Sequence, residues 1–303
     1  MDTKERPPTN GSYRSGYDLP PLPLDQFLDE IDKMPREKEV IEGALVEKQL
    51  GLIAGDPWTG KSLEEQRVAC AFEAGADYHG LKLEQSRTLY LTWEGSTTGL
   101  ANRFRILSQS FNRDCLPIVK LMPRPTYLNT PSGFQEMGEI LQRVKDQYGV
   151  KIVLLDSFPY TIKGNYRQDE VVEEWYANVT QIMQTIEITP IVVFELRKLT
   201  MWGGVPEEYF SLERLKGAKT VGYKCHMVMM IGEVKRQRRI NGVLQWFDDG
   251  HRIVIKKAKD ARGPFDPLTV TLDRSTLLFE GDKWAWCEND QRYKAVNDHH
   301  RPI

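Results

Sequence analysis

A twelve-residue stretch, GLIAGDPWTGKS at residues 51–62, has the residue types and spacing of a phosphate-binding loop. It fits the pattern G-x-x-x-x-G-K-[ST], directly after an apolar run and directly before a helical pattern. The glycines let backbone N–H groups turn toward phosphates, and the helix N-terminus adds the positive end of its dipole. A plain strand-to-helix turn is the alternative, and the complete motif in its context outweighs it. The predicted ATP site comprises Gly55, Asp56, Pro57, Trp58, Thr59, Gly60, Lys61 and Ser62.

Two further groups would complete the phosphate chemistry. Lys61 would neutralise the β- and γ-phosphates, and the Ser62 hydroxyl would bind Mg²⁺. Asp156 ends the apolar run KIVLLDS, and a carboxylate at the carboxyl end of a buried strand lies where open α/β sheets bind ligands. We therefore predict Ser62 and Asp156 as Mg²⁺ ligands. The alternative for Asp156 is a helix cap after a strand.

Glu94 also ends a buried run, in LYLTWEGS. A carboxylate at such a position can polarise the water that attacks the γ-phosphate, which hydrolysis requires and nucleotide binding alone does not. The alternative is a solvated loop glutamate, and spacing alone does not choose between the two.

These residues require elements that hold them at one edge of a sheet. From residue 49 the chain alternates apolar runs with helical patterns, which predicts a mainly parallel sheet covered by helices on both faces. The expected strands are 49–55, 87–95, 116–123, 151–157 and 189–196, and the expected helices are 61–75, 97–111, 132–149 and 170–187.

The pattern changes after residue 222. Two long runs, 225–239 and 243–257, flank Asn241-Gly242, which is a strong hairpin signal. A further turn at Asp249-Gly250 and strands at 267–273 and 277–281 indicate an antiparallel extension of the sheet. The expected divisions are a flexible proline-rich arm at 1–23, a core domain at 24–286 that starts with a short amphipathic helix, and a polar tail at 287–303.

Composition limits the compartment and the partners. The formal net charge of -2 offers no global basic field for nucleic acid, so any such site has to be local. The 4 cysteines show no paired spacing, which argues against a disulfide framework or a zinc site. No run is long enough to span a bilayer and no secretory leader is present, so we expect a cytoplasmic protein without a membrane partner.

The order of these segments resembles that of the RecA-like hexameric ATPases, and within them the group of the RepA-type plasmid replicative helicase. After GDPWTGKS come LYLTWEGSTTGLANRFRIL, similar to the strand with the catalytic glutamate, IVLLDSF, similar to Walker B, and TPIVVFELRK. RLKGAKTVGYKCHMVMMI and KAKDARGPFDPLTVTLD resemble the RGSS-type and KNRFGP-type segments. The resemblance implies a RecA-like P-loop NTPase core with a C-terminal antiparallel extension, with Glu94 as catalytic base.

The chain departs from that group at three positions. Glu195 stands where histidine usually precedes the RK pair, and an ionised glutamate cannot donate a hydrogen bond to the γ-phosphate. Lys216 replaces the arginine of the RGSS-type segment. Arg262 lies one position later than its counterpart, so the finger residue that reaches a neighbouring subunit's nucleotide is either Lys259 or Arg262.

Two loops would face the channel of such a ring. They span 158–169 and 197–217, and both combine cations with aromatic side chains, as single-strand binding requires. The candidate nucleic-acid contacts are Lys163, Arg167, Arg197, Lys198 and Trp202. The densest basic run, 235–239, is better explained as a charged edge strand.

These observations favour an ATP-dependent motor that forms a homo-oligomeric ring, expected to be a hexamer. It would translocate on single-stranded DNA or unwind duplex DNA, and it would hydrolyse ATP between subunits. The first alternative is an ATP-dependent module that binds or loads nucleic acid or protein with slow or no hydrolysis. The second is a small-molecule kinase, for which the sequence lacks an arginine-rich lid.

Overall fold

The computed structural model describes residues 21–33, 38–111, 116–166, 168–196, 210–215, 219–240, 243–258 and 264–296. It divides the chain into two compact units, Met1–Lys38 and Glu39–Ile303. The first unit contains the expected short helix, α1 (Leu24–Lys33), on which Leu24 and Leu28 are exposed. The core domain was expected from residue 24, and the second unit runs from Glu39.

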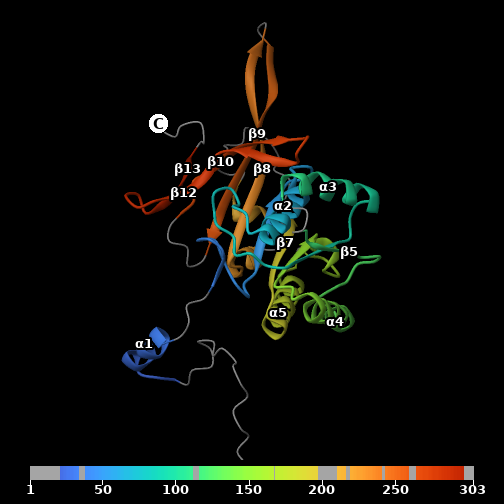
Figure 1. Ribbon diagram of the computed structural model, residues 1–303, viewed down its shortest axis with the longest axis vertical. Coiled ribbons are helices and arrows are strands. Elements are labelled where there is room, and N and C mark those ends of the chain that lie inside the picture. Colours follow the sequence, from blue (N-terminus) through green and yellow to red (C-terminus); the bar gives the residue numbers. More distant parts are fainter. Residues whose placement is uncertain are drawn as a thin grey trace, which may run out of the picture. The chain divides into compact units, whose positions relative to one another are not determined.

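The second unit is built on a nine-stranded sheet with the order β11-β10-β9-β8-β3-β7-β6-β4-β5. The six strands from β8 to β5 run parallel, and β9, β10 and β11 continue the sheet in antiparallel fashion (Figure 1). The expected fold class is confirmed. The strand bounds are β3 (Gly51–Gly55), β4 (Thr88–Thr92), β5 (Ile118–Leu121), β6 (Ile152–Asp156), β7 (Thr189–Glu195), β8 (Met227–Ile240), β9 (Val243–Ala258), β10 (Leu268–Asp273) and β11 (Leu278–Gly281).

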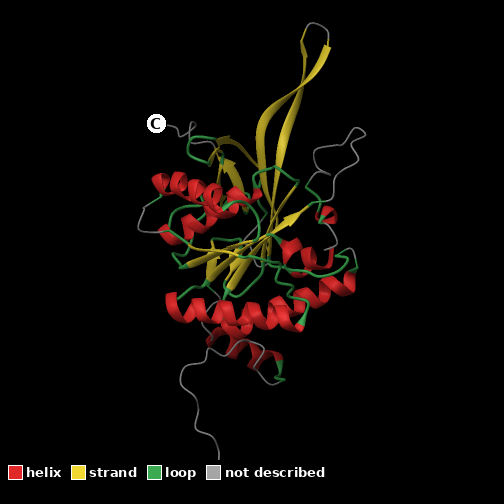
Figure 2. Cartoon of the chain, turned by 90° about the vertical axis from the view of Figure 1, so that its right-hand side faces the viewer, coloured by secondary structure: helices red, strands yellow, loops and turns green. Residues whose placement is uncertain are grey.

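Helices cover both faces of this sheet (Figure 2). Side chains alternate along a strand, so Leu52 and Ala54 of β3 pack into one apolar core with α4 and α5, and Ile53 packs into the other with α2 and α3. Burial on both faces is the reason these strands read as continuous apolar runs. The helices are α2 (Lys61–Ala74), α3 (Thr97–Ser110), α4 (Pro131–Tyr148), α5 (Asp169–Ile186), α7 (Lys219–Lys224) and the 3₁₀ turns η2 (Phe158–Tyr160) and η3 (Leu212–Arg214).

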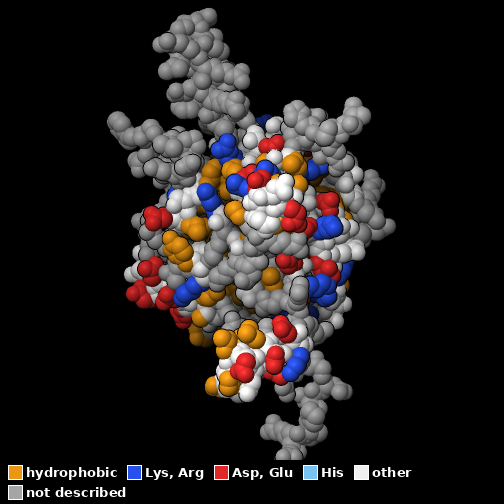
Figure 3. Space-filling model, turned by 90° about the vertical axis from the view of Figure 1, so that its left-hand side faces the viewer, with side chains coloured by type: hydrophobic (Ala, Val, Ile, Leu, Met, Phe, Trp, Pro, Cys, Tyr) orange, Lys and Arg blue, Asp and Glu red, His pale blue; other side chains and the backbone are white. Residues whose placement is uncertain are grey.

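No helix in the described ranges is both long and apolar enough to cross a membrane. On the face drawn in Figure 3, the coloured Lys and Arg side chains lie interspersed with Asp and Glu, with apolar side chains between them.

The β8–β9 hairpin projects beyond the sheet (Figure 1). β8 pairs with β3 only over Met227–Ile231, but it pairs with β9 as far as Ile240 opposite Val243. The predicted turn at Asp249-Gly250 is wrong, because β9 continues through both residues. The register shifts there instead, with one extra residue in β9, which is a β-bulge.

Two small hairpins were not expected from the sequence. β1 (Glu39–Ile41) pairs with β2 (Leu45–Val46), and β12 (Lys283–Cys287) pairs with β13 (Arg292–Val296). The expectation of a loose tail from residue 287 is therefore wrong as far as Val296. Tyr293 of β13 is buried and stacks on Phe265, with ring centroids 4.3 Å apart and planes 2° from parallel.

Candidate functional site

The phosphate-binding loop joins β3 to α2 in a backbone path that glycine makes possible. Gly60 precedes the first residue of α2 with φ of 85°, a left-handed conformation that suits glycine. A Cβ atom on Gly55 would lie 2.6 Å from the carbonyl oxygen of Ile231 on β8. Both motif glycines are therefore required by the fold, and the N-terminus of α2 lies at the loop, as the sequence predicted.

The lysine of the loop is already held inside it. Lys61 is buried, and its Nζ donates a hydrogen bond to the backbone oxygen of Asp56 at 2.7 Å. Thr59 Oγ1 donates to the same oxygen at 2.9 Å. Burial lowers the pKa of Lys61, and the nearby carboxylates of Glu195 and Asp156 oppose that effect. A phosphate group in the loop would supply the anion that a buried ammonium requires.

Ser62 and Asp156 lie side by side although 94 residues separate them. Ser62 Oγ donates to Asp156 Oδ1 at 3.0 Å, and the Tyr90 hydroxyl donates to Oδ2 at 2.6 Å. Burial raises the pKa of Asp156, and these two hydrogen bonds work against the shift. Mg²⁺ prefers oxygen ligands and takes one or two from the protein beside phosphate and water, so this pair fits the ion.

Glu94 lies next to that pair. It follows β4, which neighbours β6 with Thr92 opposite Asp156, so both carboxylates lie at the carboxyl edge of the sheet. Glu94 is exposed, and its Oε1 accepts a hydrogen bond from Ser157 Oγ at 3.0 Å. Since Ser157 directly follows Asp156, its side chain links Glu94 to the predicted metal-binding position. An exposed carboxylate here can receive a proton from water.

The remaining predicted residues divide into two groups. Trp58 is 95 % exposed, and Pro57 is exposed as well. Lys163 is also exposed, and the Asn129 side chain forms hydrogen bonds with the backbone N–H and carbonyl groups of Lys163. The others, namely Arg167, Arg197, Lys198, Trp202, Lys259 and Arg262, lie outside the described residues, as does Lys216.

Three residues at the site were missed. Tyr90 donates a hydrogen bond to Asp156, and Arg214 forms an ion pair with the Asp56 carboxylate. The ring of Phe279, on β11, packs against Gly60, where an added Cβ would lie 3.0 Å from the ring. Only Tyr90 had a usable signal, because it belongs to the same apolar run as Glu94. Arg214 is the first residue of the segment that resembles the RGSS-type block, but that resemblance gave it no role, and Phe279 comes from a distant segment with no motif around it.

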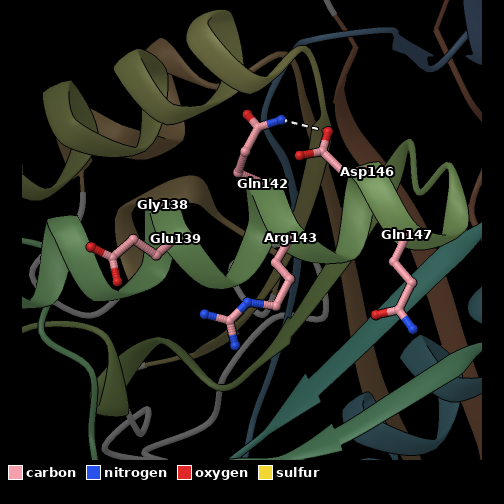
Figure 4. Close-up of a pocket in the computed structure, with 6 residues that line it drawn as sticks. All are labelled: Gly138, Glu139, Gln142, Arg143, Asp146 and Gln147. Atoms are coloured by element: carbon pink, nitrogen blue, oxygen red, sulfur yellow. Dashed lines mark hydrogen bonds between the residues drawn. The ribbon is translucent and has the colours of Figure 1, made fainter.

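A separate open hollow lies on the outer side of α4 (Figure 4). All six lining residues belong to that one helix, and Gln142 Nε2 donates to Asp146 Oδ1 at 2.8 Å. No predicted site residue lines it, so it does not mark the functional site. Among the described residues there is also no group of three or more His, Cys, Asp or Glu side chains that could hold a metal ion.

Known proteins similar to this chain are found among solved structures and protein families. Among solved structures, the matches include the crystal structure of a KaiC-like protein from the hyperthermophilic archaeon Pyrococcus horikoshii OT3. It is 14% identical, with a TM-score of 0.48, and the match covers 81% of this chain and 99% of that one. No curated protein matches the chain. The model of the family described as AAA domain matches residues 18–201, more than half of the sequence and all of the loop. The chain therefore belongs to the AAA domain family, and its residues 55–62 fit the P-loop motif of ATP-binding proteins.

Proposed function

We propose that this protein is an ATP-dependent motor that assembles as a ring, hydrolyses ATP between subunits, and translocates on or unwinds DNA. The observation that carries the proposal is the placement of Glu94 beside the metal-binding pair. Ser157 binds Glu94 at 3.0 Å, and its neighbour Asp156 binds Ser62 at 3.0 Å. A P-loop that only binds nucleotide has no need of a second carboxylate at this position.

In the proposed reaction each residue has one task. Lys61 binds the β- and γ-phosphates, and Ser62 with Asp156 holds Mg²⁺, which neutralises charge on the phosphates when it is bound. Glu94 accepts a proton from the water that attacks the γ-phosphate. Lys259 or Arg262 of the neighbouring subunit stabilises the charge that develops in the transition state. The neighbour's contribution makes an isolated subunit a weak ATPase.

The order of the sequence segments supports three parts of the proposal: the ring, the DNA partner and the likeness to the RepA-type helicases. The mainly parallel sheet with its antiparallel extension is the fold that this resemblance implies. Lys163 is exposed after β6, near Tyr160, which stacks in parallel with Trp93 at a centroid distance of 6.4 Å. Cations close to aromatic faces suit single-stranded nucleic acid.

The proposal is tested by measuring ATP hydrolysis with and without single-stranded DNA, for the wild type and for Glu94→Gln. We expect DNA to stimulate hydrolysis in the wild type and the variant to bind ATP without turnover. Lys61→Ala serves as the control that loses nucleotide binding itself. A hydrolysis rate that is the same with and without DNA would contradict the proposed motor and support only an ATPase activity.

The second candidate is an ATP-gated module that binds or loads nucleic acid or protein with slow hydrolysis. It is favoured by Glu195, which pairs in register with Gly55 and lies near enough to Lys61 to affect its pKa. A carboxylate there adds negative charge where a γ-phosphate sensor is expected to donate a hydrogen bond. In this candidate, Glu94→Gln would leave partner binding unchanged, whereas it abolishes a motor.

A further inference from the structure

The P-loop of this chain carries a partly buried ion pair that its motif does not predict. Asp56 is the first residue after Gly55, and both of its carboxylate oxygens accept hydrogen bonds from Arg214 NH2, at 2.9 and 3.1 Å. The side chain of Arg214 is only 6% exposed, and that of Asp56 is 22% exposed. A contact this enclosed is less screened by water than a surface pair.

The segment that supplies Arg214 is fastened to the same part of the loop. Leu196, at the end of β7, donates its N–H to the Gly55 oxygen at 3.1 Å and forms a β-bridge with Leu215. Arg214 closes the 3₁₀ turn η3 by donating its N–H to Ser211 at 3.1 Å. These backbone contacts hold the segment that carries Arg214 close to the loop.

The charge of Asp56 is a difficulty for a phosphate-binding loop. The backbone oxygen of Asp56 accepts hydrogen bonds from the side chains of Lys61 and Thr59. Asp56 is therefore part of the loop that would enclose the phosphates. A carboxylate in that loop repels a polyanionic ligand unless its charge is compensated and its oxygens are held aside. Arg214 is permanently protonated and binds both oxygens, so it meets both conditions.

We propose that Arg214 is a positioning residue of the nucleotide site: it neutralises Asp56 and holds its carboxylate away from the bound phosphates. Through Arg214, the segment after β7 sets the affinity of the P-loop for ATP. This inference rests on the proposed function, since it assumes that ATP occupies residues 55–62. It adds a residue that lies 158 positions from its partner in sequence.

The test measures the dissociation constant of a non-hydrolysable ATP analogue with Mg²⁺ by calorimetry. For Arg214→Gln we expect affinity to fall about tenfold or more, because the Asp56 charge is then uncompensated. Adding Asp56→Asn to that variant removes the stranded charge and restores most of the affinity. Arg214→Lys keeps the charge but has a different length and lacks the planar guanidinium, so its affinity lies between those of the wild type and Arg214→Gln.

A matched control removes an arginine from another partly buried pair. Arg87 NH1 binds the buried Glu73 at 2.8 Å, at the start of β4 and therefore at the opposite end of the strand from Glu94. Arg87→Gln should bind the analogue as the wild type does.

The outcomes separate the two levels of the proposal. If the wild type does not bind the analogue, the proposed function fails. If the wild type binds and Arg214→Gln binds equally well, only the role of Arg214 fails. If affinity falls in Arg214→Gln and Asp56→Asn brings no recovery, the pair is merely structural and the inference is overturned. The double variant also covers the case in which the single variant folds poorly.

Discussion

At the scale of single residues, Asp156, the proposed Mg²⁺ ligand, is held by neighbours on both of its carboxylate oxygens. Its Oδ1 faces Ser62 and its Oδ2 is occupied by the Tyr90 hydroxyl, which in turn accepts a hydrogen bond from Gln66 Nε2 at 2.9 Å. Tyr90 is fully buried between α2 and the sheet, and its ring packs edge-on against Phe104. Groups that orient a ligand in this way often matter nearly as much as the ligand itself.

We therefore expect Tyr90→Phe to weaken Mg²⁺ binding about tenfold or more while leaving nucleotide binding without metal unchanged, because Oδ2 loses its donor and Asp156 its fixed orientation. The measurement is a Mg²⁺ titration of the affinity for an ATP analogue, run beside a titration in chelator. Tyr148→Phe, on a tyrosine that is 44% exposed at the end of α4, is the matched control. Equal Mg²⁺ affinity in Tyr90→Phe and wild type would exclude this role.

The sequence predicted the site unevenly, for a physical reason. Lys61, Ser62, Asp156 and Glu94 could be found because motif spacing and strand ends place them at one sheet edge whatever the rest of the chain does. Arg214 could not, because its contact with Asp56 depends on how a segment 158 residues away packs over the loop. The local pattern of apolar and polar residues does not predict a contact between such distant segments.

At the scale of elements, strand and helix positions were predictable where an element is buried on both faces or ends in a strong signal. α2 ends at Gly75 and α4 at Gly149, both left-handed, as the glycine positions indicated. Asp249-Gly250 misled because the same dipeptide suits a bulge as well as a turn. β13 was not predicted because its buried Tyr293 lies among polar residues, and the five-residue segment is too short to show a clear alternating pattern.

The β12–β13 hairpin supports a prediction about stability. Tyr293 stacks on Phe265, and its hydroxyl would lie 2.1 Å from a Cβ on Gly43, so the ring fills a tight space near β1. Tyr293→Ala should lower the free energy of unfolding by about 3 kcal/mol, as expected when a buried aromatic side chain is truncated.

The free energy of unfolding is measured by chemical denaturation for Tyr293→Ala and for a control variant, Val296→Ala. Val296 is a suitable control because it lies on the same strand and is 41% exposed. A hairpin that belongs to the domain gives a large loss for Tyr293 and almost none for Val296. If both variants unfold at the wild-type denaturant concentration, residues 287–296 form a tail after all.

At the scale of the whole molecule, the proposed reaction draws on a cation besides Lys61, which lies inside the loop, and Arg214, which is engaged with Asp56. The proposed ring supplies that cation from the next subunit. A head-to-tail interface of this kind joins two different surfaces of the same chain.

Two inactive variants should then rescue each other. Glu94→Gln lacks the base in its own site but keeps its finger, and Arg262→Ala keeps the base but lacks the finger. In mixed rings, about a quarter of the interfaces pair an intact site with an intact finger, so hydrolysis returns in proportion. The measurement is ATPase activity across mixing ratios, with the maximum expected at equal amounts.

The same mixing series with Lys259→Ala identifies the finger, since only the variant of the true finger residue is inactive alone and rescued by Glu94→Gln. Mixing Glu94→Gln with Lys61→Ala is the control for trivial recovery: the interface between a Lys61→Ala site and an intact finger still cannot bind ATP. Absence of rescue in every mixture, with both single variants folded and inactive, would mean that each chain hydrolyses ATP with its own residues. The ring would then be unnecessary for the chemistry, whatever it does for DNA.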